Sequence, residues 1–256
     1  MDFTGKTAIV TGGSGGIGLA VARVLLDGGA NVMLAARDAG KLADAAAQLD
    51  AGNAVQHQVT DISSEEAVEA LVAATKSAFG QVDIFVANAG TEGTVKPLLD
   101  LELEEFSSVQ RINVDGTFLC IKHGARAMLD SGGGAIVVTG SVASMVGVPG
   151  LGAYTPSKHA VAGLVQVAAL ELAEAGVRVN AVAPAPIDNA MMRKIESMVA
   201  PPEAQAAAQA GFEALIPMKR YGKNEEVAQA VAFLASDAAS FVNGAILPVD
   251  GGFLAA

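Results

Sequence analysis

The chain contains 256 residues, of which 52% are hydrophobic, and it carries a formal net charge of −11 at pH 7. This length and composition allow one large buried core, so we expect one domain that spans residues 1–256. The acidic balance would repel a nucleic-acid backbone and an anionic membrane surface, so neither is expected as a partner.

The cysteine content and the start of the chain indicate a cytoplasmic protein. Cys120 is the only cysteine, so no intrachain disulfide can form. The first residues, MDFTGKTAIVTGG, lack the basic and apolar regions of a secretory signal. No apolar run reaches the roughly twenty residues that a transmembrane helix needs.

Seven short runs rich in β-branched residues alternate with stretches of helical periodicity. Repeated strand–helix–strand units predict a parallel sheet, and nearly continuous apolar strands predict burial on both faces. We therefore predict an α/β, Rossmann-like, doubly wound sheet of seven parallel strands with helices on both faces. The candidate strands are TAIVTG, NVMLAAR, AVQHQVTD, VDIFVANAG, GAIVVTGS, VRVNAVAP and AILPVDGG.

The segment TGGSGGIG, residues 11–18, follows the first predicted strand and opens the first helix. Its glycines permit a tight turn and a close approach to a pyrophosphate, which a helix N-terminus stabilises. A simple glycine-rich turn is the alternative, but the position between strand and helix favours dinucleotide binding. The expected contacts are Gly12, Ser14, Gly16, Ile17 and Gly18.

The second predicted strand ends at Ala36 and is followed by Arg37. A carboxylate at this strand end would bind the adenosine ribose and repel a 2′-phosphate, whereas a guanidinium can bind that phosphate. We therefore expect NADP as cofactor, with NAD as the other possibility. The alternative is that Arg37 is an ordinary solvated charge, partly offset by Asp38.

The stretch GAYTPSKHA places Tyr154 and Lys158 four residues apart. In a helix these positions share one face, so the ammonium can lie beside the phenol. Pro156 is tolerated only near a helix start, so the pair is expected close to an N-terminus. The alternative is a surface pair without function.

Residues 186–218 interrupt the alternation of strands and helices, because they contain no predicted strand. Such an insertion is either a disordered loop or a lid over a site, and we expect a substrate lid. Its methionines and those of VASMVGVPGLGA would form an apolar pocket. This pocket would suit an apolar ketone or secondary alcohol with an alicyclic or aryl body.

Together with NAG at 88–90, NVDG at 113–116 and Ser141, these motifs resemble the short-chain dehydrogenases/reductases. The resemblance extends from the first strand to VDGG at 249–252, and it implies an NAD(P)-dependent oxidoreductase that forms a homotetramer or homodimer. It implies that Tyr154 is the general acid/base and that Lys158 binds the ribose. We expect Lys158 and the cofactor charge to lower the pKa of the phenol.

The resemblance also implies roles for residues other than Tyr154 and Lys158. Ser141 would donate to the developing alkoxide, and Asn113 would hold a water beside the lysine. Ala185 replaces a glycine of the family, so its backbone would be strained if this position needs a positive φ. Asp61 could instead cap the helix that begins near Ser64. The implied cofactor contacts are Asp61, Ile62, Asn88, Ala89, Gly90, Tyr154, Lys158, Pro184, Ile187 and Asn189.

Two alternative functions follow from the same sequence. A 3-oxoacyl-carrier-protein reductase would need a basic landing surface for its acidic carrier, which this acidic chain disfavours. A cofactor-binding regulator without turnover would not need Ser141, Tyr154 and Lys158 together. No metal site is expected, because the three histidines show no metal-ligand clustering in the sequence.

Overall fold

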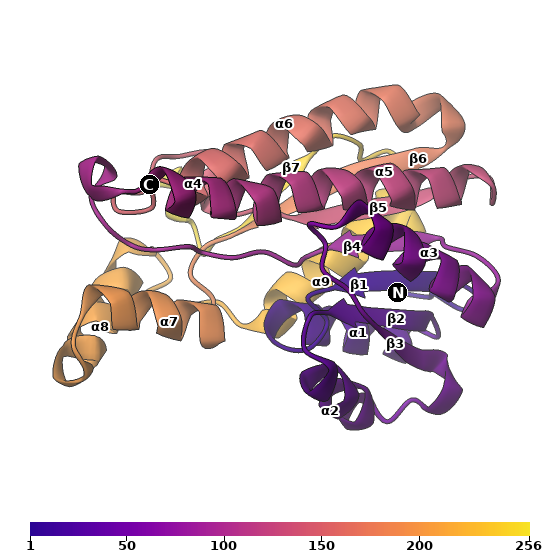
Figure 1. The fold of residues 1–256 in the computed structure, drawn as a ribbon, viewed down its shortest axis with the longest axis horizontal. Coiled ribbons are helices and arrows are strands. Elements are labelled where there is room, and N and C mark those ends of the chain that lie inside the picture. Colours follow the sequence, from indigo (N-terminus) through magenta and orange to yellow (C-terminus); the bar gives the residue numbers. More distant parts are fainter.

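The computed structural model describes residues 1–256, and its centre is a seven-stranded parallel sheet (Figure 1). The strand order is β3-β2-β1-β4-β5-β6-β7. Each predicted strand segment contains one of these strands, so the predicted fold class is confirmed. The strands are β1 (Thr7–Thr11), β2 (Asn31–Ala36), β3 (Val55–Val59), β4 (Ile84–Ala87), β5 (Gly134–Thr139), β6 (Val177–Pro184) and β7 (Ile246–Val249).

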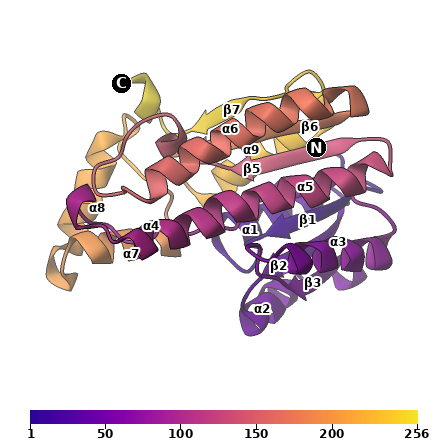
Figure 2. The ribbon, with the colours of Figure 1, turned by 45° about the horizontal axis from the view of Figure 1, so that its top comes forward.

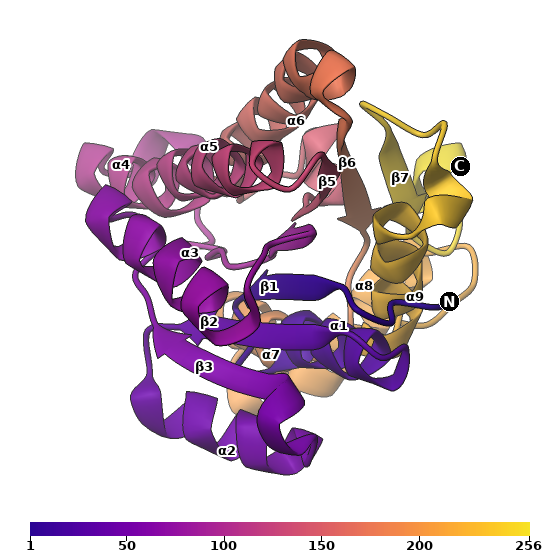
Figure 3. The same ribbon diagram turned by 90° about the vertical axis from the view of Figure 1, so that its right-hand side faces the viewer.

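Helices cover both faces of the sheet (Figure 3). One layer contains α1, α2 and α9, and the other contains α3, α5 and α6. These helices are α1 (Gly16–Asp27), α2 (Ala39–Leu49), α3 (Glu65–Phe79), α5 (Gly116–Leu129), α6 (Tyr154–Leu172) and α9 (Asn224–Ala235). None of the helices combines the length and apolar character that crossing a bilayer requires.

The strand side chains enter two apolar cores, one on each face of the sheet. In β5, Val137 packs into the core of α1 and α9, whereas Ile136 and Val138 pack into the core of α3, α5 and α6. Successive side chains of a strand point to opposite faces, so both faces need apolar residues. This is the physical reason for the uninterrupted apolar strands in the sequence.

The order of the strands reverses beside β1, because β1 pairs with both β2 and β4. In open α/β sheets, the crevice at such a reversal, outside the carboxyl ends of the strands, is the usual ligand site. The segments that follow β1, β4 and β5 meet at this edge. The residues directly after these strands are therefore the candidates for ligand binding.

Two features flank this edge of the sheet. Helix α4 (Leu103–Gln110) continues into α5 through a π-helical turn, Arg111–Asp115, and this pair runs beside α6 (Figure 2). Residues 186–218 form α7 (Ala190–Val199) and α8 (Gln205–Leu215), without a strand, as predicted. Both helices lie beyond the end of the sheet, in orange in Figure 1.

Candidate active site

A cavity of about 770 Å³ lies at the carboxyl edge of the sheet. The glycine loop, the ends of β2, β4, β5 and β6, and helices α6, α7 and α8 all contribute to its wall. Most of the predicted site residues line this cavity, but Gly18 and Asn113 do not. The predicted residues that line it are Gly12, Ser14, Gly16, Ile17, Arg37, Asp61, Ile62, Asn88, Ala89, Gly90, Ser141, Tyr154, Lys158, Pro184, Ile187 and Asn189.

The glycine loop has the features of an anion cradle. Helix α1 begins at Gly16 without a side-chain cap and without an acidic residue in its first turn. A Cβ atom on Gly15 would meet nothing within 4 Å, so the loop is open toward the cavity there. Free N–H groups at a helix N-terminus bind phosphate, so this loop fits the pyrophosphate of a dinucleotide.

Two glycines of the loop are required for packing. A Cβ on Gly18 would lie 2.3 Å from the Gly12 carbonyl oxygen, and one on Gly12 would lie 2.7 Å from Asn88 Nδ2. Gly18 therefore allows α1 to approach the loop closely, and it has no surface toward the cavity. The expected direct contact between Gly18 and the cofactor is replaced by this packing role.

At the end of β2, the cavity wall carries two cations. Both Arg37 and Lys41, which lies on α2, line the cavity. The Asp38 carboxylate caps α2 by accepting a hydrogen bond from the Lys41 N–H at 3.0 Å. Sequence analysis missed Lys41, which follows Arg37 by four residues. Both cations could bind a phosphate group.

Asp61 does not cap a helix, which settles the alternative that the sequence left open. Its Oδ1 accepts hydrogen bonds from the Ser63 N–H at 3.0 Å and from Ser63 Oγ at 2.7 Å. These bonds lower the pKa of Asp61. The cap of α3 is Ser64, which accepts from the Ala67 N–H at 3.2 Å. Asp61 therefore lies at the cavity as a charged, locally held carboxylate.

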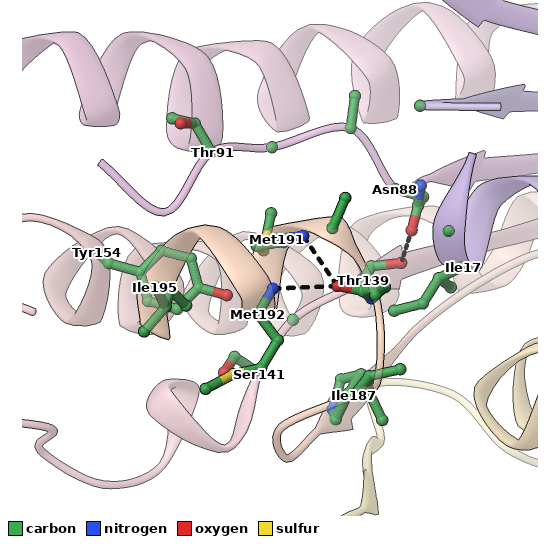
Figure 4. A pocket seen from close by; sticks show the side chains of 18 of the residues that line it. Ile17, Asn88, Thr91, Thr139, Ser141, Tyr154, Ile187, Met191, Met192 and Ile195 are labelled. Carbon is green, nitrogen blue, oxygen red and sulfur yellow. Dashed lines mark hydrogen bonds between the residues drawn. The ribbon is translucent and has the colours of Figure 1, made fainter. Parts of the chain in front are cut away.

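Hydrogen bonds join the ends of β1, β4 and β5 beneath the cavity. Asn88 Nδ2 donates to the Thr11 carbonyl at 3.0 Å, and Thr139 Oγ1 donates to Asn88 Oδ1 at 3.0 Å (Figure 4). Thr11 Oγ1 accepts from the N–H groups of Asn88 and Ala89. Thr11 ends the first strand motif, and sequence analysis did not single it out. This network fixes the backbone over which a ligand would pass.

Tyr154 and Lys158 lie together at the start of α6, as their spacing predicts. Tyr154 is the first residue of the helix, and Pro156 is the third. Lys158 Nζ donates to the Thr139 carbonyl at 2.7 Å and lies 5.5 Å from the centre of the Tyr154 ring. Lys158 is buried. The alternative of an exposed surface pair is therefore wrong.

Burial raises the pKa of Tyr154 to about 12, and the neighbouring Ser141 side chain partly opposes this rise. The expected lowering of this pKa, which includes the cofactor charge, stays a prediction. Burial also lowers the pKa of Lys158 to about 8. A low dielectric disfavours the charged form of each group. The chain alone therefore holds a neutral phenol beside a lysine that is easily deprotonated.

Ser141 performs a local backbone role and also faces the phenol. It caps the short 3-10 turn Val142–Ser144 by accepting from the Ala143 N–H at 3.1 Å. Its side chain and that of Tyr154 both line the cavity (Figure 4). The structure shows the cap, and the expected donation to an alkoxide stays a prediction.

Asn113 lies in the π-helical turn between α4 and α5, where it is 1% exposed. Its Nδ2 donates to the Thr91 carbonyl at 2.9 Å and to Ser157 Oγ at 3.0 Å, and its Oδ1 accepts from the Thr91 N–H at 2.8 Å. A Cβ on Gly90 would lie 3.1 Å from this Oδ1 and 3.9 Å from Lys158 Nζ. Asn113 therefore ties the loop after β4 to α6, and one acceptor position stays free beside Gly90.

The segment after β6 departs from the family pattern without strain. Ala185 is not among the residues with positive φ, so the replacement of glycine there carries no backbone penalty. Asn189 caps α7 by accepting from the N–H groups of Met191 and Met192, and its Nδ2 donates to Asn224 Oδ1 at 3.2 Å. Both polar atoms of the Asn189 amide are therefore engaged within the protein, although Asn189 also lines the cavity as an implied cofactor contact.

The end of the cavity near Ser141 and Tyr154 is apolar. The loop Val142–Leu151 forms one side, and α7 and α8 form another (Figure 4). All the apolar residues here except Phe253 lie in the two apolar stretches that the sequence singled out, residues 142–153 and 186–218. The apolar lining here consists of Val142, Val148, Leu151, Met191, Met192, Ile195, Phe212, Leu215 and Phe253.

One histidine lies in a group of potential metal ligands, which the sequence spacing did not indicate. His123 on α5 lies beside Glu65 and Glu69 on α3, with ligand atoms within 4.8 Å of one another. The Lys122 ammonium forms an ion pair with Glu65 in the same cluster. The Glu65 carboxylate therefore has Lys122 as a cationic partner within the protein. The cluster is remote from the cavity and does not include any residue of its wall.

Comparison with known proteins places the chain in a family. A family model described as "Enoyl-(Acyl carrier protein) reductase" matches residues 12–254. The chain is 42% identical to a 2,5-dichloro-2,5-cyclohexadiene-1,4-diol dehydrogenase of Sphingobium indicum, over 99% of each chain. It is 41% identical to a cis-4-hydroxycyclohexanecarboxylate dehydrogenase of Sinomonas cyclohexanicum, over 99% of this chain and 98% of the relative.

A solved structure agrees with these relatives. The crystal structure of an NAD+-bound xylitol dehydrogenase matches with a TM-score of 0.93 and 35% identity, over 98% of this chain and 100% of the other. The strand order, the glycine loop and the grouping of Ser141, Tyr154 and Lys158 fit the same family. The chain therefore belongs to the short-chain dehydrogenases/reductases, and it is an oxidoreductase of alcohol and carbonyl groups that uses a nicotinamide cofactor.

Proposed function

We propose that the protein interconverts an alicyclic or aryl ketone and the corresponding secondary alcohol, with NADP as the preferred cofactor. The observation that carries this proposal is the apolar end of the cavity, which opens directly onto Ser141 and Tyr154. A carbonyl that reaches these hydroxyls leaves the body of the substrate among apolar side chains. The relatives from Sphingobium and Sinomonas, whose names specify six-membered rings, support the alicyclic class.

The side chains of the cavity divide the chemistry between them. The bound nicotinamide supplies or accepts the hydride. Tyr154 Oη gives a proton to the substrate oxygen during reduction and takes it back during oxidation. Ser141 orients that oxygen by a hydrogen bond. Lys158, held by the Thr139 carbonyl, would bind the ribose and favour the phenolate electrostatically.

Residues outside this group are proposed to bind and enclose the ligands. The N-terminus of α1 would bind the pyrophosphate, with Gly12, Ser14, Gly16 and Ile17 at its surface. The remaining cofactor contacts would come from the segments after β3, β4 and β6. Residues 186–218 would act as the substrate lid of a single-domain protein, because α7 and α8 contribute much of the apolar wall.

The NADP preference rests on charge at the end of β2. Ala36 offers no carboxylate against a 2′-phosphate, and Arg37 and Lys41 offer two cations. Asp38 also lines the cavity and partly offsets these cations, although its carboxylate caps α2. The related xylitol dehydrogenase was solved with NAD+, so membership of the family does not by itself predict NADP. The proposed preference depends on Arg37 and Lys41.

The reduction of carrier-bound 3-oxoacyl chains is the second candidate. The description of the matching family model shares the carrier-bound acyl substrate with it, but names an enoyl group and not a 3-oxoacyl group. The net charge of −11 and the absence of basic side chains from the apolar end of the cavity oppose it. A regulator without turnover has no support from the cavity, where Ser141, Tyr154 and Lys158 meet. We further propose a homodimer or homotetramer that works in the cytoplasm on small-molecule substrates.

A panel of ketones tests the proposal. The purified protein would be assayed by NADPH absorbance with cyclohexanone, cyclohexane-1,4-dione and acetophenone, and with a 3-oxoacyl-carrier protein for comparison. The proposal expects turnover of at least one ring ketone and much lower efficiency with the carrier-bound chain. Turnover of the carrier-bound chain alone would establish the second candidate instead.

A further inference from the structure

Glu92 is a buried carboxylate that the chemistry described above does not use. It lies in the loop between β4 and α4, two residues after Gly90, and is 5% exposed. Its Oε1 forms an ion pair with the ammonium of Lys194, which is its one charged partner. A buried charge that lacks a partner is costly, so this ion pair is important for keeping Glu92 in place.

The two residues adjoin opposite walls of the cavity, because their chain neighbours line it. Gly90 and Thr91, directly before Glu92, line the cavity from the loop after β4. Met191 and Ile195, which flank Lys194 on α7, line it from the other side. Figure 4 shows Thr91 on its loop above the side chains of α7. The Glu92–Lys194 pair therefore spans the space between the loop and the helix.

Other polar contacts of α7 stay on its own side of the cavity. Arg193 hydrogen-bonds Glu196, Asp188 and Gln209, which joins α7 to α8. The Tyr221 hydroxyl donates to Glu196 Oε1 at 2.7 Å. These bonds connect α7 to α8 and to the segment that contains Tyr221. No other hydrogen bond or ion pair connects α7 to the loop after β4.

The position of Glu92 also links this pair to the reacting groups. Its negative charge raises the pKa of Tyr154, so the carboxylate lies close enough to the phenol to affect it. The Lys194 side chain is 59% exposed, so water can reach it. The pair thus combines a buried anion near the reaction centre with a cation on a surface helix.

We propose that Glu92 and Lys194 are a positioning pair that holds α7 closed over the substrate end of the cavity. The pair places Met191, Met192 and Ile195 against the ligand, and its separation opens the cavity at this side. Neither residue takes part in proton transfer. The inference depends on the proposed function only in that the apolar end of the cavity holds the substrate.

Hydrogen–deuterium exchange of residues 190–199 in the cofactor-free protein tests the pair without any substrate. In Lys194→Met, the buried carboxylate loses its partner, so we expect amide exchange in α7 at least about fivefold faster than in the wild type. Glu92→Gln removes the attraction without leaving a buried charge, so a smaller increase is expected. The matched control is Lys76→Met, which removes a lysine from the surface pair Lys76–Asp130, 2.9 Å long and remote from the cavity.

Kinetics with a turned-over ketone provide the second readout. Lys194→Met is expected to raise KM by about fivefold or more while kcat changes less, because it weakens enclosure and leaves the proton donor in place. The charge-exchanged double variant, Glu92→Lys with Lys194→Glu, is expected to recover part of this loss. Exchange and KM within twofold of wild type in both Lys194→Met and Glu92→Gln would overturn the proposal. Failure of every ketone would refute the proposed function and leave the exchange result valid.

Discussion

Tyr154 is the residue on which the proposed chemistry depends most. Its side chain lines the cavity together with Ser141, at the end that is proposed to hold the substrate. Tyr154→Phe should lower kcat at least about a hundredfold, because it removes the proton donor and little else. Cofactor affinity, measured by fluorescence titration, should stay near wild type. Retention of most activity by the Phe variant would show that the proton comes from another group.

Lys158 gives a prediction about pH because burial lowers its pKa to about 8. The ammonium is charged below this value and neutral above it, so its attraction for the cofactor ribose should fade as pH rises through 8. We expect the Kd of NADPH to increase between pH 7 and pH 9, as measured by titration calorimetry. Lys158→Ala should bind cofactor weakly, turn over slowly and lose this pH dependence. A change in rate alone would refute the ribose role.

At the scale of elements, the helices and strands could be predicted well from the sequence. Contacts between side chains that are distant in the sequence could not. Strands were identifiable because both faces of the sheet demand apolar residues, and α6 because Pro156 marks its start. The π-helical turn around Asn113 has no signature in a continuous helical pattern. The raised pKa of Tyr154 depends on burial by distant segments, and the pairing of Glu92 with Lys194 joins residues about a hundred positions apart. Neither is encoded in local spacing.

The junction of β2 and α2 should determine the choice of cofactor. A guanidinium–phosphate contact contributes about 1.5 to 3 kcal/mol, so NADPH should exceed NADH in kcat/KM by roughly tenfold to a hundredfold. Ala36→Asp combined with Arg37→Leu should reverse this order, because the new carboxylate binds the ribose and repels the phosphate. Lys41→Met alone should reduce the preference without reversing it. Equal efficiencies in the wild type would mean that Arg37 is only a solvated surface charge.

At the scale of the whole molecule, exposed apolar side chains on two neighbouring helices predict self-association. Leu170 and Val167 on α6 are 81% and 54% exposed, and Phe118 on α5 is 47% exposed. A monomer would leave this surface in water, whereas a symmetric dimer or tetramer would cover it. Light scattering at micromolar concentration should give a dimer or tetramer, and Leu170→Lys should shift it to a smaller species. A matched change at exposed Val59, at the edge strand, should have no effect. A wild-type monomer would contradict the prediction.

The central claim, that the protein passes hydride to a ring ketone while Tyr154 supplies the proton, is tested most directly by isotope transfer. Cyclohexanone would be incubated with NADPH carrying deuterium at the transferable nicotinamide position, and the alcohol would be analysed by mass spectrometry. The account predicts one deuterium on the carbinol carbon with the wild type and at least about a hundredfold less alcohol with Tyr154→Phe in the same time. Unlabelled alcohol, or equal yields from both proteins, would contradict it.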